Sequence, residues 1–236
     1  MEINIFILCY NEAPLLPHTV KHYRKYLPSC KITIYDNEST DNSVELAKSL
    51  GCSIISWNSN NIIDDHKYLE IKNNCWKQIT HGWIIMADMD EFLCVTEDEL
   101  LDEMKNESSI LQVKGIDMVG ESNTLDLTDI DLQEIKKYKY NTYENKNLCF
   151  FREKIEEISY GIGAHDCKPV GNIKYSSKIY YNKHMDWLGL NYSINKKLKR
   201  YERSELMRSY GWCIQYINDI TKIKELYNSN LNNSAF

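Results

Sequence analysis

The sequence predicts an α/β fold in which helices flank a mainly parallel central sheet, with further helices at the C-terminal end. Short apolar runs alternate with segments in which apolar residues recur every three or four positions. Strand–helix–strand units of this kind form parallel sheets. The chain has 236 residues, of which 43% are hydrophobic, and no Gly/Ser-rich linker divides it. We therefore expect a single domain over 1–236.

Local signals place the elements of the first half. The expected strands are 3–9, 31–35, 53–57, 83–87 and 110–114, and the expected helices are 12–27, Ser39 or Thr40 to Leu50, 64–78 and a last one through Met104. Ser39 or Thr40 is expected to cap the second helix. Thr96 and Glu99 have the spacing of a capping box, which opens the last helix.

After residue 104 the alternation of strand and helix signals becomes less regular. The polar stretch 115–147 is interpreted as loops and irregular strands that line a second pocket. Strands are expected at 148–152 and 174–181, and helices over 188–227.

Composition excludes several classes of function. The net charge of −6 argues against a nucleic-acid-binding surface. No apolar run approaches the roughly 20 residues of a membrane-spanning helix. The eight cysteines form no Cys-x-x-Cys pair, which argues against a zinc site and favours a reducing compartment, the cytoplasm. A basic run near 196–203 can also touch anionic lipid, so peripheral membrane contact is compatible with this location.

The most informative motif follows the apolar run 83–87. Asp88 and Asp90 are two residues apart, and extended backbone points such side chains to the same side. Two close carboxylates repel unless a cation lies between them, and a hard divalent ion with oxygen ligands leaves positions for substrate phosphates. The plain alternative is an acidic turn or helix cap.

Two other expected strands end in polar residues. Tyr10, Asn11 and Glu12 follow the first strand, and Asp36 and Asn37 follow the second. Ligands of open α/β sheets bind at the carboxyl ends of the strands, so we expect these side chains to converge with Asp88. Carboxylate and amide groups suit a ribose or a base edge.

The runs Cys-Tyr-Asn-Glu, Tyr-Asp-Asn-Glu-Ser-Thr-Asp-Asn-Ser and Met-Ala-Asp-Met-Asp-Glu-Phe-Leu resemble family-2-like glycosyltransferases of the GT-A fold. The Asp-x-Asp-Glu-Phe form is similar to a branch found in bacteria and large DNA viruses. The resemblance covers roughly the first 100 residues, by motif order and spacing. It implies a nucleotide-sugar-binding half at 1–104 and an acceptor-binding half at 105–236. The residues that it assigns to the nucleotide are Tyr10, Asn11, Glu12, Asp36, Asn37 and Asp88.

The resemblance also implies a metal-dependent transfer of a sugar from a nucleoside diphosphate sugar, first of all a UDP-sugar, to an acceptor hydroxyl. The acceptor is a glycan, a lipid-linked sugar or a protein, and the transfer is expected to be inverting. Asp88 and Asp90 would ligate Mn²⁺ or Mg²⁺, and a late histidine, His184, would complete the metal shell. The second half of the chain lacks the Glu-Asp base pair and the Gln-x-x-Arg-Trp box of the commonest family-2 pattern.

Three questions stay open at the level of sequence. The catalytic base is Asp166, beside two glycines and His165, or Asp117, after the expected strand 110–114. The alternative functions are a phosphohydrolase of the haloacid-dehalogenase type and a nucleotide-sugar-binding pseudoenzyme. A basic helix is expected to present mostly solvated cations, of which one or two reach the donor diphosphate; these are Lys196, Lys197, Lys199, Arg200 and Arg203.

Overall fold

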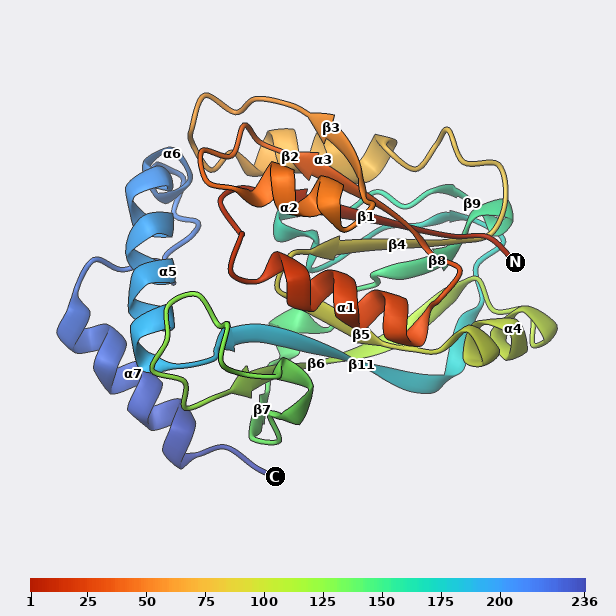
Figure 1. The fold of residues 1–236 in the computed structure, drawn as a ribbon. Helices are drawn as coiled ribbons and strands as arrows, with labels where there is room; N and C mark the ends of the chain where they lie inside the picture. The colour runs from red at the N-terminus through yellow and green to blue at the C-terminus, as the bar shows by residue number, and fades with distance from the viewer.

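The computed structural model describes residues 1–236 as a nine-stranded mixed sheet covered by helices, together with a separate two-stranded sheet (Figure 1). The strands are β1 (Ile3–Cys9), β2 (Lys31–Asp36), β3 (Ser53–Ser56), β4 (Trp83–Asp88), β5 (Glu91–Cys94), β6 (Ile110–Val119), β7 (Tyr138–Tyr140), β8 (Cys149–Phe151), β9 (Ile155–Glu157), β10 (Val170–Gly171) and β11 (Tyr175–Trp187). The α-helices are α1 (Leu16–Tyr26), α2 (Ser43–Ser49), α3 (Asp65–Asn74), α4 (Glu97–Lys105), α5 (Leu190–Arg203), α6 (Glu205–Ser209) and α7 (Ile220–Asn232). Four 3₁₀ turns are η1 (Leu132–Glu134), η2 (Thr142–Glu144), η3 (Arg152–Lys154) and η4 (Ile162–Ala164).

The central sheet has the strand order β3-β2-β1-β4-β8-β6-β11-β5, and β7 pairs with β6. The four strands from β3 to β4 are parallel, as expected. β8 then joins β4 and β6 in antiparallel fashion, and β5 joins β11 in the same way. The expected α/β fold is confirmed, and its second half carries the antiparallel pairs.

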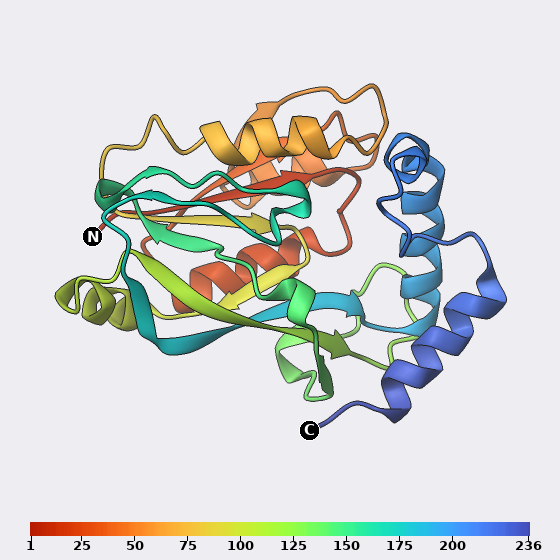
Figure 2. The ribbon, with the colours of Figure 1, turned by 180° about the vertical axis from the view of Figure 1, so that it is seen from behind.

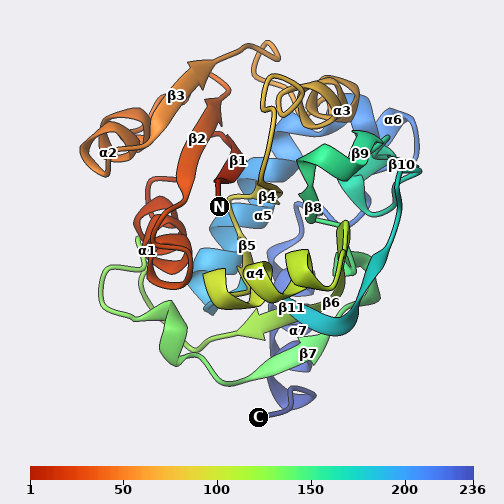
Figure 3. The same cartoon turned by 90° about the vertical axis from the view of Figure 1, so that its right-hand side faces the viewer.

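Helices cover both faces of the parallel part. α1 and α2 lie on one face and α3 on the other (Figures 1 and 3). The inner strands β1 and β4 are nearly continuous runs of buried residues, mostly apolar, which is the pattern of strands covered on both sides. The carboxyl end of β4 points toward α5, which stands across this edge of the sheet in both views (Figures 1 and 2).

The structure corrects two details of the elements expected before residue 115. α2 begins at Ser43 after Asn42, so Ser39 and Thr40 are not its caps. Their hydroxyls instead contact Asn11, whose backbone takes a left-handed conformation. β6 continues to Val119, which places Asp117 inside a strand rather than after it. The capping box of Thr96 and Glu99 is confirmed.

None of the helices combines the length and the apolar character that crossing a membrane requires. All eight cysteines are free.

Candidate functional site

A cavity of about 770 Å³ opens at the carboxyl edge of the parallel strands, within the size range of small-molecule sites. The tips of β1, β2 and β4 form one wall, as the sequence predicts. α5 and the segment 211–216 form another wall. Polar residues from 115–147 line this same cavity rather than a second pocket; they are Asp117, Asn141, Tyr143, Glu144 and Lys146.

The acidic tip after β4 is held in place from behind. β4 ends at Asp88 and residues 89–90 form a turn, so the extended-strand argument does not apply to Asp90, although both carboxylates line the cavity. Helix α1 fixes this turn, because Thr19 Oγ1 donates to the Met89 carbonyl at 2.7 Å. Glu91 Oε2 accepts the Asp88 backbone N–H at 2.7 Å. The glutamate of the motif therefore shapes the turn.

Two buried lysines neutralise Asp88. Lys72 Nζ lies 2.7 Å from Oδ1 and Lys146 Nζ lies 3.6 Å from Oδ2. Burial favours the neutral acid, but the two ammonium groups outweigh it and lower the pKa of Asp88 to about 2. Asp88 is therefore an ionised acceptor at neutral pH.

Asp90 has a separate set of cations, supplied by α5. Its Oδ2 lies 2.7 Å from Lys196 Nζ and 3.2 Å from Arg200 Nη2. Burial opposes ionisation, yet these two cations hold the pKa of Asp90 well below its ordinary value. Arg200 also lies 3.6 Å from Glu12 and bonds to the Tyr216 hydroxyl at 3.2 Å. One guanidinium thus joins the tips of β1 and β4 to the segment 211–216.

His184 lies between two carboxylates. Its Nδ1 is 2.7 Å from Asp117 Oδ1, and its Nε2 is 3.6 Å from Asp90 Oδ2. Burial lowers the pKa of this imidazole, but Asp117 and Asp90 together raise it well above its ordinary value. Asp117 is engaged on both oxygens, since Asn141 Nδ2 donates to its Oδ2 at 3.0 Å.

Three of the residues predicted to bind a nucleotide line the cavity beside Asp88, namely Tyr10, Glu12 and Asn37. The Arg203 guanidinium stacks 3.3 Å from the centre of the Tyr10 ring. The Asn37 side chain is buried and bonds to Ser59 through both of its polar atoms. These contacts fix the loops at the ends of β1, β2 and β3.

Asn11 and Asp36 lie just behind the cavity wall and do not line it. Asn11 Oδ1 accepts the backbone N–H of Thr40 at 2.7 Å, which joins the first two strand tips. Asp36 Oδ2 accepts the Ser39 N–H at 3.0 Å, while its buried Oδ1 has no hydrogen-bond partner. An unpaired buried acceptor is costly, so a hydrogen bond to Asp36 Oδ1 would be favourable if a ligand group reached it.

The two sequence candidates for the catalytic base are placed differently. Asp117 lines the cavity. Asp166 is exposed and does not line it, although its neighbours from Ile162 to His165 do.

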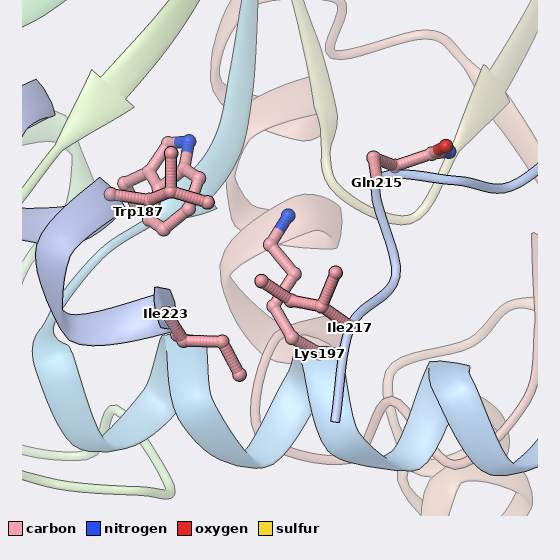
Figure 4. A pocket seen from close by; sticks show the side chains of 6 residues that line it. Trp187, Lys197, Gln215, Ile217 and Ile223 are labelled. Carbon is pink, nitrogen blue, oxygen red and sulfur yellow. The ribbon is translucent and has the colours of Figure 1, made fainter. Parts of the chain in front are cut away.

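The sequence interpretation of the basic helix underestimated its burial. Lys196 and Lys197 are only 8% and 7% exposed, so they lie on the inner face of α5. Lys197 forms an ion pair with Asp186 at 2.5 Å and lies over the Trp187 ring. It also borders a small apolar cavity of about 110 Å³ between α5, α7 and the segment 215–217 (Figure 4). The spacing of Lys196 and Arg200, four residues apart, was the available signal for a shared face.

Two cationic residues of the site, Lys72 and Lys146, carried no sequence signal. Lys72 lies within α3 and Lys146 in the irregular stretch before β8. Both are buried, and an aliphatic stem with a paired ammonium allows this.

The side chains of Asp88, Asp90 and His184 are of the chemical types that bind divalent ions. Carboxylate oxygens and an imidazole nitrogen are common ligands, and a metal-bound histidine usually donates its other N–H to a carboxylate, as His184 can to Asp117. No group of three or more His, Cys, Asp or Glu side chains is already arranged to hold a metal. Asp90 would have to exchange a contact to Lys196 or Arg200 for the ion.

Comparison with known proteins identifies the family of the chain. The family model described as "Glycosyl transferase family 2" matches residues 4–143. Protein RfbJ of Shigella flexneri is 30% identical over 55 residues, which are 23% of this chain and 43% of that protein. The chain thus matches less than half the length of this curated relative.

Two solved structures have similar folds. S. aureus TarS 1–349 in complex with UDP is 13% identical, with a TM-score of 0.51, over 90% of this chain and 73% of that chain. Mannosyltransferase PcManGT from Pyrobaculum calidifontis, in complex with GDP-Man and Mn²⁺, is 10% identical, with a TM-score of 0.44, over 85% of this chain and 61% of that chain. The GT-A fold expected from the sequence is confirmed.

Proposed function

The chain belongs to glycosyl transferase family 2, and on that premise we propose that it transfers a sugar from a nucleoside diphosphate sugar to an acceptor hydroxyl. The observation that carries the proposal is the cavity at the edge of the sheet, where two ionised aspartates face buried lysines and an arginine. A site with both charge signs suits a diphosphate held by cations beside a sugar held by carboxylates.

The nucleotide is assigned to the tips of β1 and β2. Tyr10, Glu12 and Asn37 would contact it directly. Asn11 would hold the loop that follows β2, and Asp36 would offer its unpaired Oδ1. TarS is known in complex with UDP, which supports a uridine nucleotide as the first donor to test.

Lys197, Arg200 and Arg203 extend from α5 into the cavity wall. Arg200 is the best-placed ligand for the donor diphosphate, because it already lies at the tips of β1 and β4. A guanidinium can bind a phosphate through two parallel hydrogen bonds.

Mn²⁺ or Mg²⁺ is proposed as the cofactor, with Asp88, Asp90 and His184 as the residues that would hold it. A bound divalent ion would stabilise the negative charge that develops on the leaving diphosphate. Asp117 would orient His184 through the 2.7 Å contact to Nδ1.

We propose an inverting transfer to a hydroxyl of a glycan, a lipid-linked sugar or a protein. Inversion requires a base on the face of the sugar opposite to the leaving group. Asp117 and Asp166 remain the candidates from the sequence, and of these two only Asp117 lines the cavity.

The test is a panel of UDP-glucose, UDP-galactose, UDP-N-acetylglucosamine and GDP-mannose, each with Mn²⁺ and with EDTA. Thermal shift reports binding, and release of the nucleoside diphosphate reports slow transfer to water. A transferase is expected to bind one donor and hydrolyse it. Binding without release would indicate a pseudoenzyme, and the absence of both would contradict the proposal.

A further inference from the structure

We propose that Glu144 is the catalytic base of this site, the group that takes the proton of the acceptor hydroxyl. The inference rests on the proposed function and names a residue that the sequence did not single out. Glu144 closes the turn η2 and lines the same cavity as Asp88 and Asp117. Its side chain is 8% exposed, so a substrate in the cavity would shield it from water.

Close contacts with β6 fix the position of Glu144. A Cβ added at Gly115 of β6 would lie 2.3 Å from the Glu144 Cβ, so only glycine leaves room for it. The Gly115 N–H is bonded to Asn145 at 2.8 Å, and its carbonyl accepts the Asn141 N–H at 3.0 Å. The turn that carries Glu144 is therefore fixed against the central sheet.

The carboxylate of Glu144 forms an ion pair with a lysine, but its Oε2 has no hydrogen-bond partner. Its Oε2 lies 3.1 Å from Lys146 Nζ, without the alignment of a hydrogen bond. Lys146 also lies 2.7 Å from Glu91 and 3.6 Å from Asp88. One ammonium thus ties Glu144 to the acidic tip of β4. By contrast, both oxygens of Asp117 have partners, and Asp166 lies outside the cavity wall.

Glu144 pairs with a different cation from Arg200, the residue assigned to the leaving group. Lys196 and Arg200 pair with Asp90 on the α5 side, whereas Glu144 pairs with Lys146 beside β6, and no ion pair joins the two groups. An inverting displacement needs its base and its leaving group on opposite faces of the sugar. The proposal places the diphosphate at Arg200 and the incoming hydroxyl at Glu144, two residues that line the same cavity and share no ion pair.

The step balances as follows. The acceptor oxygen forms a bond to the anomeric carbon while its proton passes to the Glu144 carboxylate. The bond from the anomeric carbon to the diphosphate oxygen breaks, and its electron pair leaves with the nucleoside diphosphate. With water as the acceptor, the products are the free sugar and the nucleoside diphosphate, so the step can be followed before the natural acceptor is known.

The test compares Glu144→Gln with wild type, using UDP affinity by calorimetry and UDP release from UDP-glucose and UDP-N-acetylglucosamine. We expect UDP affinity within about twofold of wild type and release slowed 10²–10⁴-fold, the usual contribution of a general base. Wild-type release should rise with pH along an acidic limb, and this limb should disappear in Glu144→Gln. Glu144→Asp should keep the limb at a reduced rate.

Glu91→Gln is the matched control, because it removes an equally buried carboxylate from the same Lys146 without lining the cavity. It should lower thermal stability and retain the pH limb. An unchanged release rate in Glu144→Gln, or equal losses of UDP affinity and rate, would overturn the assignment. If Glu144→Gln does not fold, loss of the pH limb in Glu144→Asp would also overturn it. If wild type binds UDP but hydrolyses no donor of the panel, the proposed function itself fails.

Discussion

Replacing Asp90 by asparagine removes one charge from a buried carboxylate that three side chains surround. Its Oδ2 lies 2.7 Å from Lys196 Nζ, 3.2 Å from Arg200 Nη2 and 3.6 Å from His184 Nε2. Asparagine keeps the shape of the side chain, so the effects of Asp90→Asn report its charge.

The loss of stability in Asp90→Asn depends on the ion pairs that Lys196 and Arg200 keep. Breaking a buried ion pair by removing one partner costs about 3–5 kcal/mol. Lys196 keeps Asp186 at 3.0 Å, and Arg200 keeps Glu12 at 3.6 Å. We therefore expect a loss at the low end, about 3 kcal/mol in the free energy of unfolding. Lys196→Met combined with Asp90→Asn should cost less than the sum of the two, with a coupling of about 1–3 kcal/mol.

Asp90→Asn should change UDP affinity differently with and without Mn²⁺. Without metal, Asp90→Asn frees Arg200 for the diphosphate, so UDP should bind at least as tightly as to wild type. With Mn²⁺, the additional UDP affinity expected for wild type should be lost, because an amide does not neutralise the ion. Donor hydrolysis should fall with it.

The assays are urea unfolding and calorimetry with UDP, with and without Mn²⁺. Asp102→Asn is the control, since Asp102 forms an exposed ion pair with Lys105 and its loss should change stability by less than about 1 kcal/mol. Unchanged stability with no coupling to Lys196 would refute the ion-pair argument. An unchanged Mn²⁺ effect with full turnover would refute the metal role of Asp90.

Three further predictions concern other sites. Asp36→Ala should weaken UDP binding by about 1.5–3 kcal/mol in calorimetry, the worth of a hydrogen bond to a charged group; unchanged affinity would leave Asp36 only its turn contact to Ser39. His184→Ala should lower Mn²⁺ and UDP affinity together, and unchanged metal affinity would make His184 a structural partner of Asp117. Burial lowers the pKa of His22 to about 4. The unfolded chain therefore binds the proton first between about pH 6.5 and 4, and His22 should contribute a loss of about 2 kcal/mol of stability from pH 7 to pH 5. Urea unfolding at both pH values measures this, and an equal loss in His22→Gln would contradict it.

The sequence predicted the elements whose signals are local. Buried strands appear as apolar runs, and the residues after them fall at the same edge of the sheet because parallel strands point the same way. Asp88 and Asp90 were found in this manner, and both line the cavity. The register Leu8 to Asp88 and Cys9 to Asp36 brings the three tips together.

The counter-charges could not be predicted in the same way. Lys196 meets Asp90 across 106 positions of sequence, and Lys146 meets Glu91 across 55. A lysine on a charged helix face is usually solvated, so the sequence pattern predicts an exposed side chain. Only the three-dimensional structure shows the carboxylate with which a buried lysine pairs. Glu144 was missed for the same reason, since its place depends on a glycine of β6 in another part of the chain.

The order of the sheet explains why the site needs the whole chain. β4 and β5 are neighbours in sequence, yet β8, β6 and β11 lie between them in the sheet. The acidic turn therefore connects two strands that are separated in the sheet by strands of the second half. Helix α5, also from the second half, supplies the cations that pair with Asp90. A fragment ending near residue 104 would leave Asp90 without these cations and β5 without its partner strand β11. The division into a nucleotide-sugar-binding half, 1–104, and an acceptor-binding half, 105–236, stays a prediction. Side chains from both ranges line the one cavity, and the cations that pair with Asp90 come from the second range.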